Sequence, residues 1–324
     1  MSFSPTSTHP TSQTRLPFSW RFLLPQYWGI WLLMACVLPW VWLPLRVQFW
    51  LGRTLGVVLY HGIARRRRDT LINMALIFPE KSASEHAQLA KRVFIQAGVG
   101  VFESLCAWFR PHVFDGCWDV TGADAVLKAQ HNGHAVILLG AHYTLLDLGG
   151  LLMSHVLPID VIYRPQNNAL LDWFIFNART HIYRRQISHR DMRALAQSLK
   201  DGHAVWYSPD QDFGLKQGVM APFFGVPAAT ITAQRRLARL GNKQKPPVFF
   251  MFHAYRTTAP NVPRPHYQLT LSPPLSDYPS QNETADAARI NALLEQLMLV
   301  DPTQYMWFHR RFKTQPDGTK YYAK

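Results

Sequence analysis

The amino-terminal part of the chain is apolar in a way that the rest is not. Residues 1–20 begin with a stretch rich in Ser, Thr and Pro that has no hydrophobic period, so we expect a disordered lead-in there. Between Arg21 and Arg46 no residue carries a charge. Because about 20 apolar residues span the core of a bilayer, this run predicts a membrane-anchoring helix over residues 21–46. The prolines within it argue against one smooth span, and a buried core helix is the alternative.

Residues 47–324 show the hydrophobic pattern of a globular domain. Apolar positions recur at helical spacing within residues 69–109, with a break at Pro79, and short apolar runs then alternate with amphipathic stretches. The predicted strands are 135–140, 159–163, 204–207, 248–253 and 267–271, and the predicted helices are 147–154, 169–179, 191–200, 233–240 and 284–300. This alternation predicts an α/β fold with a mixed, largely parallel sheet flanked by helices.

The charge balance favours an acidic partner. The chain has 34 Lys and Arg against 20 Asp and Glu, a net charge of +14 with neutral histidines, and 11 Trp. An anionic membrane, an acidic carrier protein or a nucleic acid would suit this charge, but no recognised nucleic-acid motif occurs, so no nucleic acid is expected. The run Arg65–Arg68 follows the apolar segment. By the positive-inside rule it places the globular domain on the cytoplasmic side of the membrane.

A histidine and an acid in the segment HAVILLGAHYTLLDLGG are the most informative candidate site. His142 and Asp147 are five positions apart, so they would point about 140° apart on one helix and to opposite faces of one strand. They can meet only across a strand-to-helix turn, which the pattern predicts here. A histidine oriented by a carboxylate is a general base. A structural histidine followed by a helix-capping aspartate is the other interpretation of the same spacing.

Nothing else near this pair indicates an enzymic nucleophile, a metal or a cofactor. Thr144 lies in the same turn without the context of a nucleophile, so the substrate itself is expected to supply the attacking hydroxyl in an acyl or phosphoryl transfer. The spacing of His131, His134 and His142 matches no common zinc motif, and three scattered cysteines exclude a four-cysteine zinc site. No glycine-rich phosphate loop is present. We therefore expect no metal and no cofactor.

Five ordered blocks give the chain a resemblance to a known family. The His-x4-Asp pair is accompanied by FESLCAWF at 102–109, YRPQNNALLDWF at 163–174, WYSPDQDFG at 206–214, APFFGVPAATIT at 221–232 and QYMWFHRRFKTQPDG at 304–318. Together they resemble the late acyltransferases of lipid A biosynthesis, the lauroyl, myristoyl and palmitoleoyl transferases of Gram-negative inner membranes. The resemblance covers roughly residues 20–318. Asp147 stands where many members carry Glu.

This resemblance implies a fold, a reaction and two substrates. The fold would be that of the lysophospholipid acyltransferases, with an N-terminal membrane-anchoring helix. The donor would be an acyl-acyl carrier protein, a small acidic protein, and the acceptor a hydroxyl of a 3-hydroxyacyl chain on a lipid A precursor glycolipid of the Kdo-lipid IVA type. His142 would be the base and Asp147 its orienting acid, with no covalent enzyme intermediate. The enzyme would sit on the cytoplasmic side of the inner membrane.

Further polar residues in the resembling blocks are candidates for binding the acceptor. Arginine suits phosphates and carboxylates because its guanidinium binds them in a forked geometry. The candidate substrate-binding residues are Arg164, Arg310, Arg311, Asp210, Gln211 and Asp212. A solvated or ion-paired surface is the alternative for Arg310 and Arg311, as is a turn for the aspartates. A glycerophospholipid acyltransferase and a non-catalytic, membrane-tethered basic binding protein are the two alternative functions.

Overall fold

The computed structural model describes residues 13–258 and 264–323, and its centre is a seven-stranded sheet. The strand order is β1-β9-β8-β2-β5-β3-β4, and neighbours run parallel except for β8 and β9, which are antiparallel. The strands are β1 (Trp118–Thr121), β2 (Val136–Leu139), β3 (Ile159–Tyr163), β4 (Arg185–Ser188), β5 (Ala204–Tyr207), β8 (Val248–Arg256) and β9 (Tyr267–Leu271), with a separate antiparallel pair of β6 (Gly218–Phe223) and β7 (Val226–Ile231). The predicted mixed, largely parallel sheet is confirmed.

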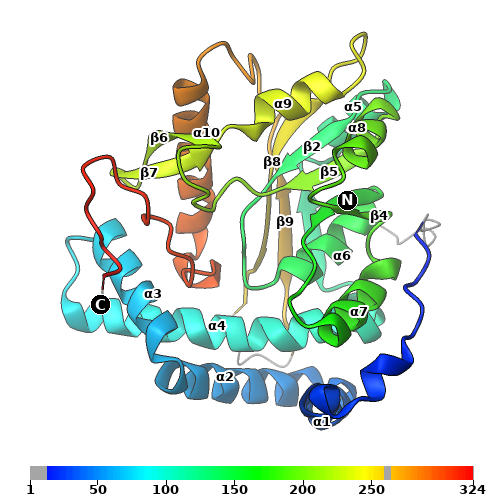
Figure 1. Ribbon diagram of the computed structural model, residues 1–324, viewed down its shortest axis with the longest axis vertical. Coiled ribbons are helices and arrows are strands. Elements are labelled where there is room, and N and C mark those ends of the chain that lie inside the picture. Colours follow the sequence, from blue (N-terminus) through cyan, green and yellow to red (C-terminus); the bar gives the residue numbers. More distant parts are fainter. Residues whose placement is uncertain (1–12, 259–263, 324) are drawn as a thin grey trace.

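Helices cover both faces of this sheet. The α-helices of the described residues are α1 (Trp28–Val37), α2 (Leu45–Gly62), α3 (Ala64–Ile77), α4 (Ala83–Phe109), α5 (Ala123–His131), α6 (Leu146–Val156), α7 (Ala169–Ala178), α8 (Met192–Lys200), α9 (Ala233–Leu240) and α10 (Glu283–Val300). Figure 1 shows α10 and the β6–β7 pair on one side of the central strands and α6 and α7 on the other. The long helix α4 runs across the lower end of the sheet.

Strand β2 explains why two layers of helices are needed. All four of its residues are fully buried. Val136 and Leu138 pack in the cluster that contains the apolar residues of α6, whereas Ile137 and Leu139 pack in the cluster that contains those of α8, α9 and α10. A strand that is apolar on both faces must be covered on both, as is usual for parallel sheets.

The sequence pattern missed the two edge strands of the sheet, the separate β6–β7 pair and the helices α2 and α5. The predicted strands and helices listed above all form, with ends shifted by a few residues. Strands β1 and β4, which terminate the sheet, were not predicted. An edge strand has one open side and needs no continuous apolar run, so sequences such as RQIS in β4 carry little strand signal.

The membrane-anchoring helix predicted for residues 21–46 is not formed. The structure divides this segment into the 3-10 turns η1 (Trp20–Leu23), η2 (Pro25–Tyr27) and η3 (Leu38–Trp42) and the ten-residue helix α1. Prolines cause the breaks, because a proline lacks the N–H that a continuing helix needs. Pro25 and Pro39 lie at the starts of η2 and η3, and Pro44 precedes α2. Within the described residues, no helix combines the length and the apolar character needed to cross a bilayer.

The lead-in predicted as disordered is in part ordered. Residues 1–12 lie outside the described residues. Gln13 pairs with the backbone of Gln186 on β4, and the Leu16 N–H donates to the Asn177 side chain on α7 at 2.7 Å. This stretch therefore runs along the β4 edge of the domain before the chain reaches α1.

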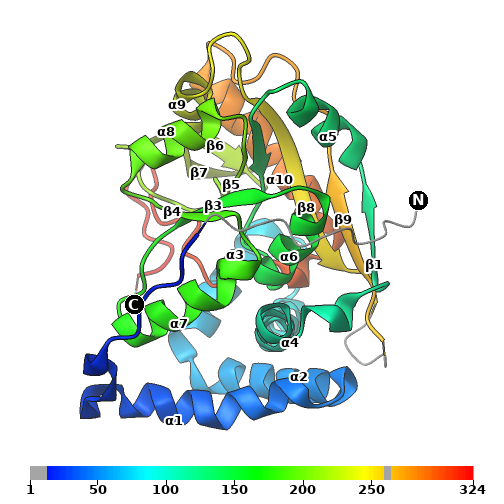
Figure 2. The ribbon, with the colours of Figure 1, turned by 90° about the vertical axis from the view of Figure 1, so that its right-hand side faces the viewer.

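Helix α2 packs tightly on α4 and extends the fold on its outer side. Glycines line the contact: a Cβ added at Gly98 of α4 would lie 2.1 Å from the carbonyl oxygen of Gly52 on α2. The two backbones can approach this closely only because no side chain intervenes. Figure 2 shows α1 and α2 nearly end to end beneath α4, so the N-terminal helices form an outer layer of the domain.

Candidate active site

His142 lies in the turn between β2 and α6, as its spacing predicted. Strand β2 ends at Leu139 and α6 begins at Leu146, so the imidazole is at the carboxyl edge of the parallel strands, where α/β proteins usually bind ligands. Gly140 allows the turn to pack tightly, because a Cβ there would lie 2.6 Å from Trp206 Nε1. The Trp206 indole consequently stands edge-on to the His142 ring, with centroids 6.1 Å apart.

The acid that contacts His142 is Asp210, which follows β5. His142 Nδ1 lies 2.8 Å from Asp210 Oδ1, and the His142 backbone N–H donates to Asp210 Oδ2 at 2.9 Å. The Tyr305 hydroxyl donates to the same Oδ2 at 2.8 Å. The Asp210 side chain is fully buried, whereas the His142 side chain remains 24% exposed. The pair therefore combines a buried, fixed carboxylate with an imidazole that solvent or substrate can reach.

The surroundings of His142 in this pair stabilise its protonated, charged form more than water would. Burial opposes the imidazolium, but the adjacent Asp210 carboxylate outweighs burial and raises the pKa of His142. Burial likewise opposes the carboxylate, yet its contacts with His142 hold the pKa of Asp210 below its usual range. His309 lies beside them, its ring centroid 5.3 Å from that of His142. Burial and the neighbouring His142 lower the pKa of His309 to about 4, so His309 stays neutral at pH 7.

Asp147 does not orient His142, contrary to the expected pairing. Its carboxylate binds Arg179 through two hydrogen bonds, Nε to Oδ1 at 2.7 Å and Nη2 to Oδ2 at 3.0 Å. The Tyr183 hydroxyl lies 3.4 Å from Oδ1. Asp147 is in the first turn of α6, where the helix dipole favours a carboxylate, and from there it faces the end of α7. The sequence predicted the strand-to-helix turn, but it did not predict that Asp147 pairs with Arg179 after α7.

A cavity of about 220 Å³ opens beside His142. Its apolar lining comes from Leu146, Ile159, Val161, Ile162, Trp206 and Phe252, and its polar lining from His142, Tyr163, Arg164, Gln166, Arg179 and Tyr183. The Arg164 side chain, one of the predicted substrate-binding residues, is therefore on the wall of the same cavity as the predicted base. Arg179, which holds Asp147, lines it as well.

The remaining predicted site residues divide into one near His142 and three elsewhere. Gln211 Nε2 lies 3.3 Å from His142 Nε2 and 3.4 Å from His309 Nε2. Asp212 accepts hydrogen bonds from the backbone N–H of Gly214 and from Thr314, and its side chain is 1% exposed. It fastens the C-terminal segment and does not face the cavity.

The two C-terminal arginines also have structural partners. Arg310 pairs with Asp69 of α3, Nε to Oδ2 at 2.9 Å. Arg311 is 1% exposed and donates to the carbonyl of Ala229 and to Thr230, with its guanidinium over the ring of Phe223. Neither guanidinium lines the cavity beside His142. The alternative of an ion-paired side chain applies to Arg310, and Arg311 is a buried packing residue.

Sequence reasoning did not identify Arg179, Tyr305 and His309. Tyr305 and His309 belong to the C-terminal block QYMWFHRRF, so the resemblance pointed at their segment but not at their contacts. Arg179 lies just after α7 and has no motif of its own. Among the described residues, no cluster of three or more His, Cys, Asp or Glu has the arrangement of a metal site.

A histidine–carboxylate pair at the carboxyl edge of a largely parallel sheet, beside a cavity with apolar and polar walls, is typical of an α/β enzyme with a partly apolar substrate. The family model described as "Bacterial lipid A biosynthesis acyltransferase" matches residues 15–314. The lipid A biosynthesis palmitoleoyltransferase of Escherichia coli K12 is 34% identical, covering 93% of this chain and 96% of its own. The lauroyltransferase of that strain is 33% identical, covering 94% and 98%. Its myristoyltransferase is 27% identical, covering 93% and 92%.

The chain belongs to the bacterial lipid A biosynthesis acyltransferase family, and it is an enzyme that transfers an acyl group in lipid A biosynthesis. The resemblance seen in the sequence blocks is thereby confirmed.

The contacts of the two aspartates lead to a prediction about the charge of His142. Replacing Asp210 by Asn should lower the pKa of His142, because the neutral amide no longer stabilises the imidazolium. Asp147→Asn should leave that pKa nearly unchanged, because its carboxylate is paired with Arg179. An NMR titration of labelled histidine, with the His142 signal assigned through His142→Ala, measures both. An equal fall in the two variants would contradict the assignment of Asp210 as the partner.

Proposed function

We propose that this protein transfers a fatty acyl chain from an acyl-acyl carrier protein to a hydroxyl of a 3-hydroxyacyl chain on a lipid A precursor of the Kdo-lipid IVA type. Membership of the acyltransferase family supports the reaction class. The observation that carries the mechanism is the His142–Asp210 pair at the wall of a cavity lined by both apolar and polar side chains. Within the described residues, the imidazole of His142 forms hydrogen bonds with the side chains of Asp210 and Gln211 and with no serine or cysteine, which supports direct attack by the substrate hydroxyl.

The hydrogen bonds to Asp210 select the tautomer of His142 that can act as a base. A carboxylate accepts hydrogen bonds, so Nδ1 carries the proton that is donated to Asp210. The lone pair of the neutral ring is then on Nε2, the nitrogen near Gln211. Asp210 is thus a positioning residue that also stabilises the imidazolium formed when Nε2 takes a proton.

The reaction then proceeds by direct transfer. The acceptor hydroxyl gives its proton to His142 Nε2 while its oxygen forms a bond to the thioester carbon of the donor. The tetrahedral intermediate collapses, the carbon–sulfur bond breaks, and the imidazolium returns its proton to the leaving thiolate of the carrier. The products are an ester on the glycolipid and a free carrier thiol, so no acyl group is ever attached to the enzyme.

The cavity provides complementary groups for both parts of such a substrate. Arg164 is exposed on its wall and has the forked geometry that binds a phosphate or carboxylate of the acceptor. The side chains of Val161, Trp206 and Phe252 offer an apolar surface for an acyl chain, and each buried methylene contributes about 0.8 kcal/mol. Arg179 is neutralised by Asp147, so we assign it to shaping the wall and not to binding an anion.

The base assignment predicts the effect of removing the imidazole. His142→Ala should lower kcat about 10²- to 10⁴-fold, the usual contribution of a general base, while the protein stays folded. His131→Ala, on the exposed end of α5, is the matched control and should transfer at the wild-type rate. Mass spectrometry of lipid A from cells with the wild type, the variants and no protein gives the mass of the added chain, and fragmentation gives its position. Near-normal acylation by His142→Ala would overturn the mechanism.

An acidic carrier as donor fits the charge of the chain. A net charge of +14 attracts a small acidic protein and accelerates the encounter more than it strengthens the final complex. We therefore expect kcat/KM for the carrier-bound donor to fall steeply as salt rises, because charges are screened beyond about 8 Å at physiological ionic strength.

A small neutral thioester with the same acyl chain is the control donor. It shares the chemistry at His142 but presents no large acidic surface, so its kcat/KM should depend much less on salt. The acceptor is kept saturating in both series, since its phosphates also respond to salt. Parallel curves for the two donors would remove the carrier from the proposal and assign the positive charge to the membrane or the acceptor.

The outer layer of the domain is the proposed contact with the anionic inner membrane, on its cytoplasmic side. Exposed aromatic and aliphatic side chains gather on α1, α2 and the turns before them, among them Trp28 at 62%, Leu32 at 67% and Trp50 at 63% exposed. Arg46 and Arg53 are exposed on α2 beside Trp50. Tryptophan favours the boundary between lipid tails and water, and each arginine near an anionic surface contributes about 1 kcal/mol.

This orientation predicts a selective loss of binding to anionic vesicles. The double variant Arg46→Ser/Arg53→Ser should float less with vesicles of phosphatidylethanolamine and phosphatidylglycerol than the wild type does. The matched control, Lys200→Ser/Lys243→Ser, removes the same charge near α8 and α9, at the other end of the molecule in Figure 1, and should bind normally. Equal losses in the two double variants would show that net charge, and not this face, determines binding.

A further inference from the structure

We propose that Gln304 is a positioning residue for the reaction, because it ties a buried polar network at the end of β8 to the turn that carries His142. The proposal rests on the function assigned to His142 above. Gln304 lies at the end of the short turn η6 (Pro302–Gln304) and is 1% exposed. It is neutral and lies outside the cavity, so neither a charge nor a substrate contact explains its burial.

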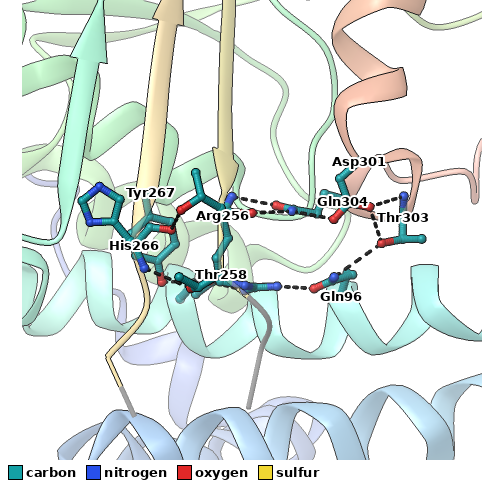
Figure 3. A network of polar contacts seen from close by, with 10 residues as sticks. Gln96, Arg256, Thr258, His266, Tyr267, Asp301, Thr303 and Gln304 are labelled. Atoms are coloured by element: carbon teal, nitrogen blue, oxygen red, sulfur yellow. Dashed lines mark hydrogen bonds and ion pairs between the residues drawn. The ribbon is translucent and has the colours of Figure 1, made fainter. Parts of the chain in front are cut away.

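The side chain of Gln304 is fully engaged with the last residue of β8. Its Oε1 accepts from the backbone N–H of Arg256 at 2.9 Å, and its Nε2 donates to the Arg256 carbonyl at 2.8 Å and to Asp301 Oδ2 at 2.8 Å. The amide thereby satisfies both backbone groups at the point where β8 leaves the sheet. Figure 3 shows Gln304 facing the backbone of Arg256, with Asp301 and Thr303 beside it.

Arg256 itself is anchored to α4. Its guanidinium binds Glu103 and Gln96 on that helix, and the side chains of the Arg256–Glu103 pair are 1% and 0% exposed. The Tyr267 hydroxyl donates to the same Glu103 oxygen at 2.8 Å. A buried ion pair with additional hydrogen bonds is a fixed reference point in the fold, because each partner would be costly to leave alone.

The backbone around Gln304 connects this anchored network to the turn that contains His142, here called the catalytic turn. Its carbonyl accepts from the Thr144 N–H at 2.7 Å, and the Met306 N–H donates to the His142 carbonyl at 2.9 Å. Between them, Tyr143 and Tyr305 form an antiparallel bridge. The turn is held from its other side too, because a Cβ at Gly100 of α4 would lie 2.1 Å from the Thr144 carbonyl oxygen.

Tyr305 completes the connection, since it follows Gln304 and its hydroxyl donates to Asp210 Oδ2. Fixing Gln304 therefore places both members of the catalytic pair: His142 through the backbone ladder, and Asp210 through Tyr305. A displacement of about 1 Å of such groups is enough to cost about 10² in rate.

The charge of the pair is a suitable readout because its other neighbours do not titrate near neutrality. Asp210 and His309 face His142, and Tyr143, Tyr207 and Tyr305 face Asp210. Burial raises the pKa of each of the three tyrosines, and the pKa of His309 is lowered to about 4. The guanidinium of Arg66 also acts on His309 and contributes to lowering its pKa. A histidine in this group that titrates above the ordinary histidine pKa is therefore His142.

The test replaces the Gln304 amide by an apolar side chain of similar size. Gln304→Met should lower kcat about 10- to 100-fold with KM values within about twofold of the wild type. It should also move the pKa of His142, measured by NMR, down toward the ordinary value of about 6.5, because the imidazole and Asp210 are no longer held together. Gln304→Leu, which also removes the amide, should shift that pKa in the same direction and provides the test if Gln304→Met does not fold.

Gln48→Met on α2 is the matched control. Gln48 is also fully buried and donates to two backbone carbonyls, those of Val41 and Leu43, but it has no contact with the catalytic turn. It should lower the thermal unfolding midpoint without changing kcat or the pKa of His142. An unchanged pKa of His142 in Gln304→Met, or in Gln304→Leu if the former is unfolded, would overturn the proposal. Because the NMR readout needs no substrate, this failure is distinct from a failure of His142→Ala to lose activity.

Discussion

The buried carboxylate of Asp210 is the interaction on which the site depends. A charged carboxylate without exposure to water is unfavourable unless donors surround it. Here the donors are the Nδ1–H and backbone N–H of His142 and the hydroxyl of Tyr305. These come from two segments far apart in sequence, so satisfying one acid brings together the turn after β2 and the C-terminal segment. The same hydrogen bonds therefore stabilise the buried carboxylate and orient the base.

The second acid of the site has a different task. Asp147 lies in the first turn of α6 and binds Arg179, which follows α7 and lines the cavity. A bidentate pair of this kind fixes two helices relative to one another. Both residues of the His-x4-Asp motif therefore contribute to the proposed site. The histidine faces the substrate, and the acid holds Arg179 in the wall of the cavity.

The C-terminal segment is held in place by polar contacts with several distant elements. Asp212 holds Thr314, Asp69 holds Arg310, and Arg311 is buried among the carbonyl of Ala229 and the side chain of Thr230. These polar contacts anchor the segment immediately after Tyr305 and His309. Polar residues that were candidates for binding substrate thus serve the site indirectly, because they fix the segment that orders Asp210.

The sequence by itself determined what depends on neighbours along the chain. The alternation of apolar runs and amphipathic stretches predicted the sheet and most helices, and the same pattern placed His142 in a turn after a buried strand. Resemblance of the ordered blocks indicated the family. The partners of these residues were decided only by the tertiary structure. Asp210 is 68 positions from His142, so no spacing rule could relate them.

The failures have the same physical origin. Arg164 directly follows β3 and lines the cavity, so the strand prediction was enough to locate it at the end of a strand. Arg310 and Arg311 are adjacent in sequence, yet Arg310 is partly exposed and pairs with the buried Asp69, whereas Arg311 is itself buried. The charge of a side chain is a local property, whereas its burial depends on which distant elements pack around it. The apolar run over residues 21–46 likewise showed that the segment is hydrophobic but did not determine its secondary structure. Its prolines and its packing against the domain decided how it folds.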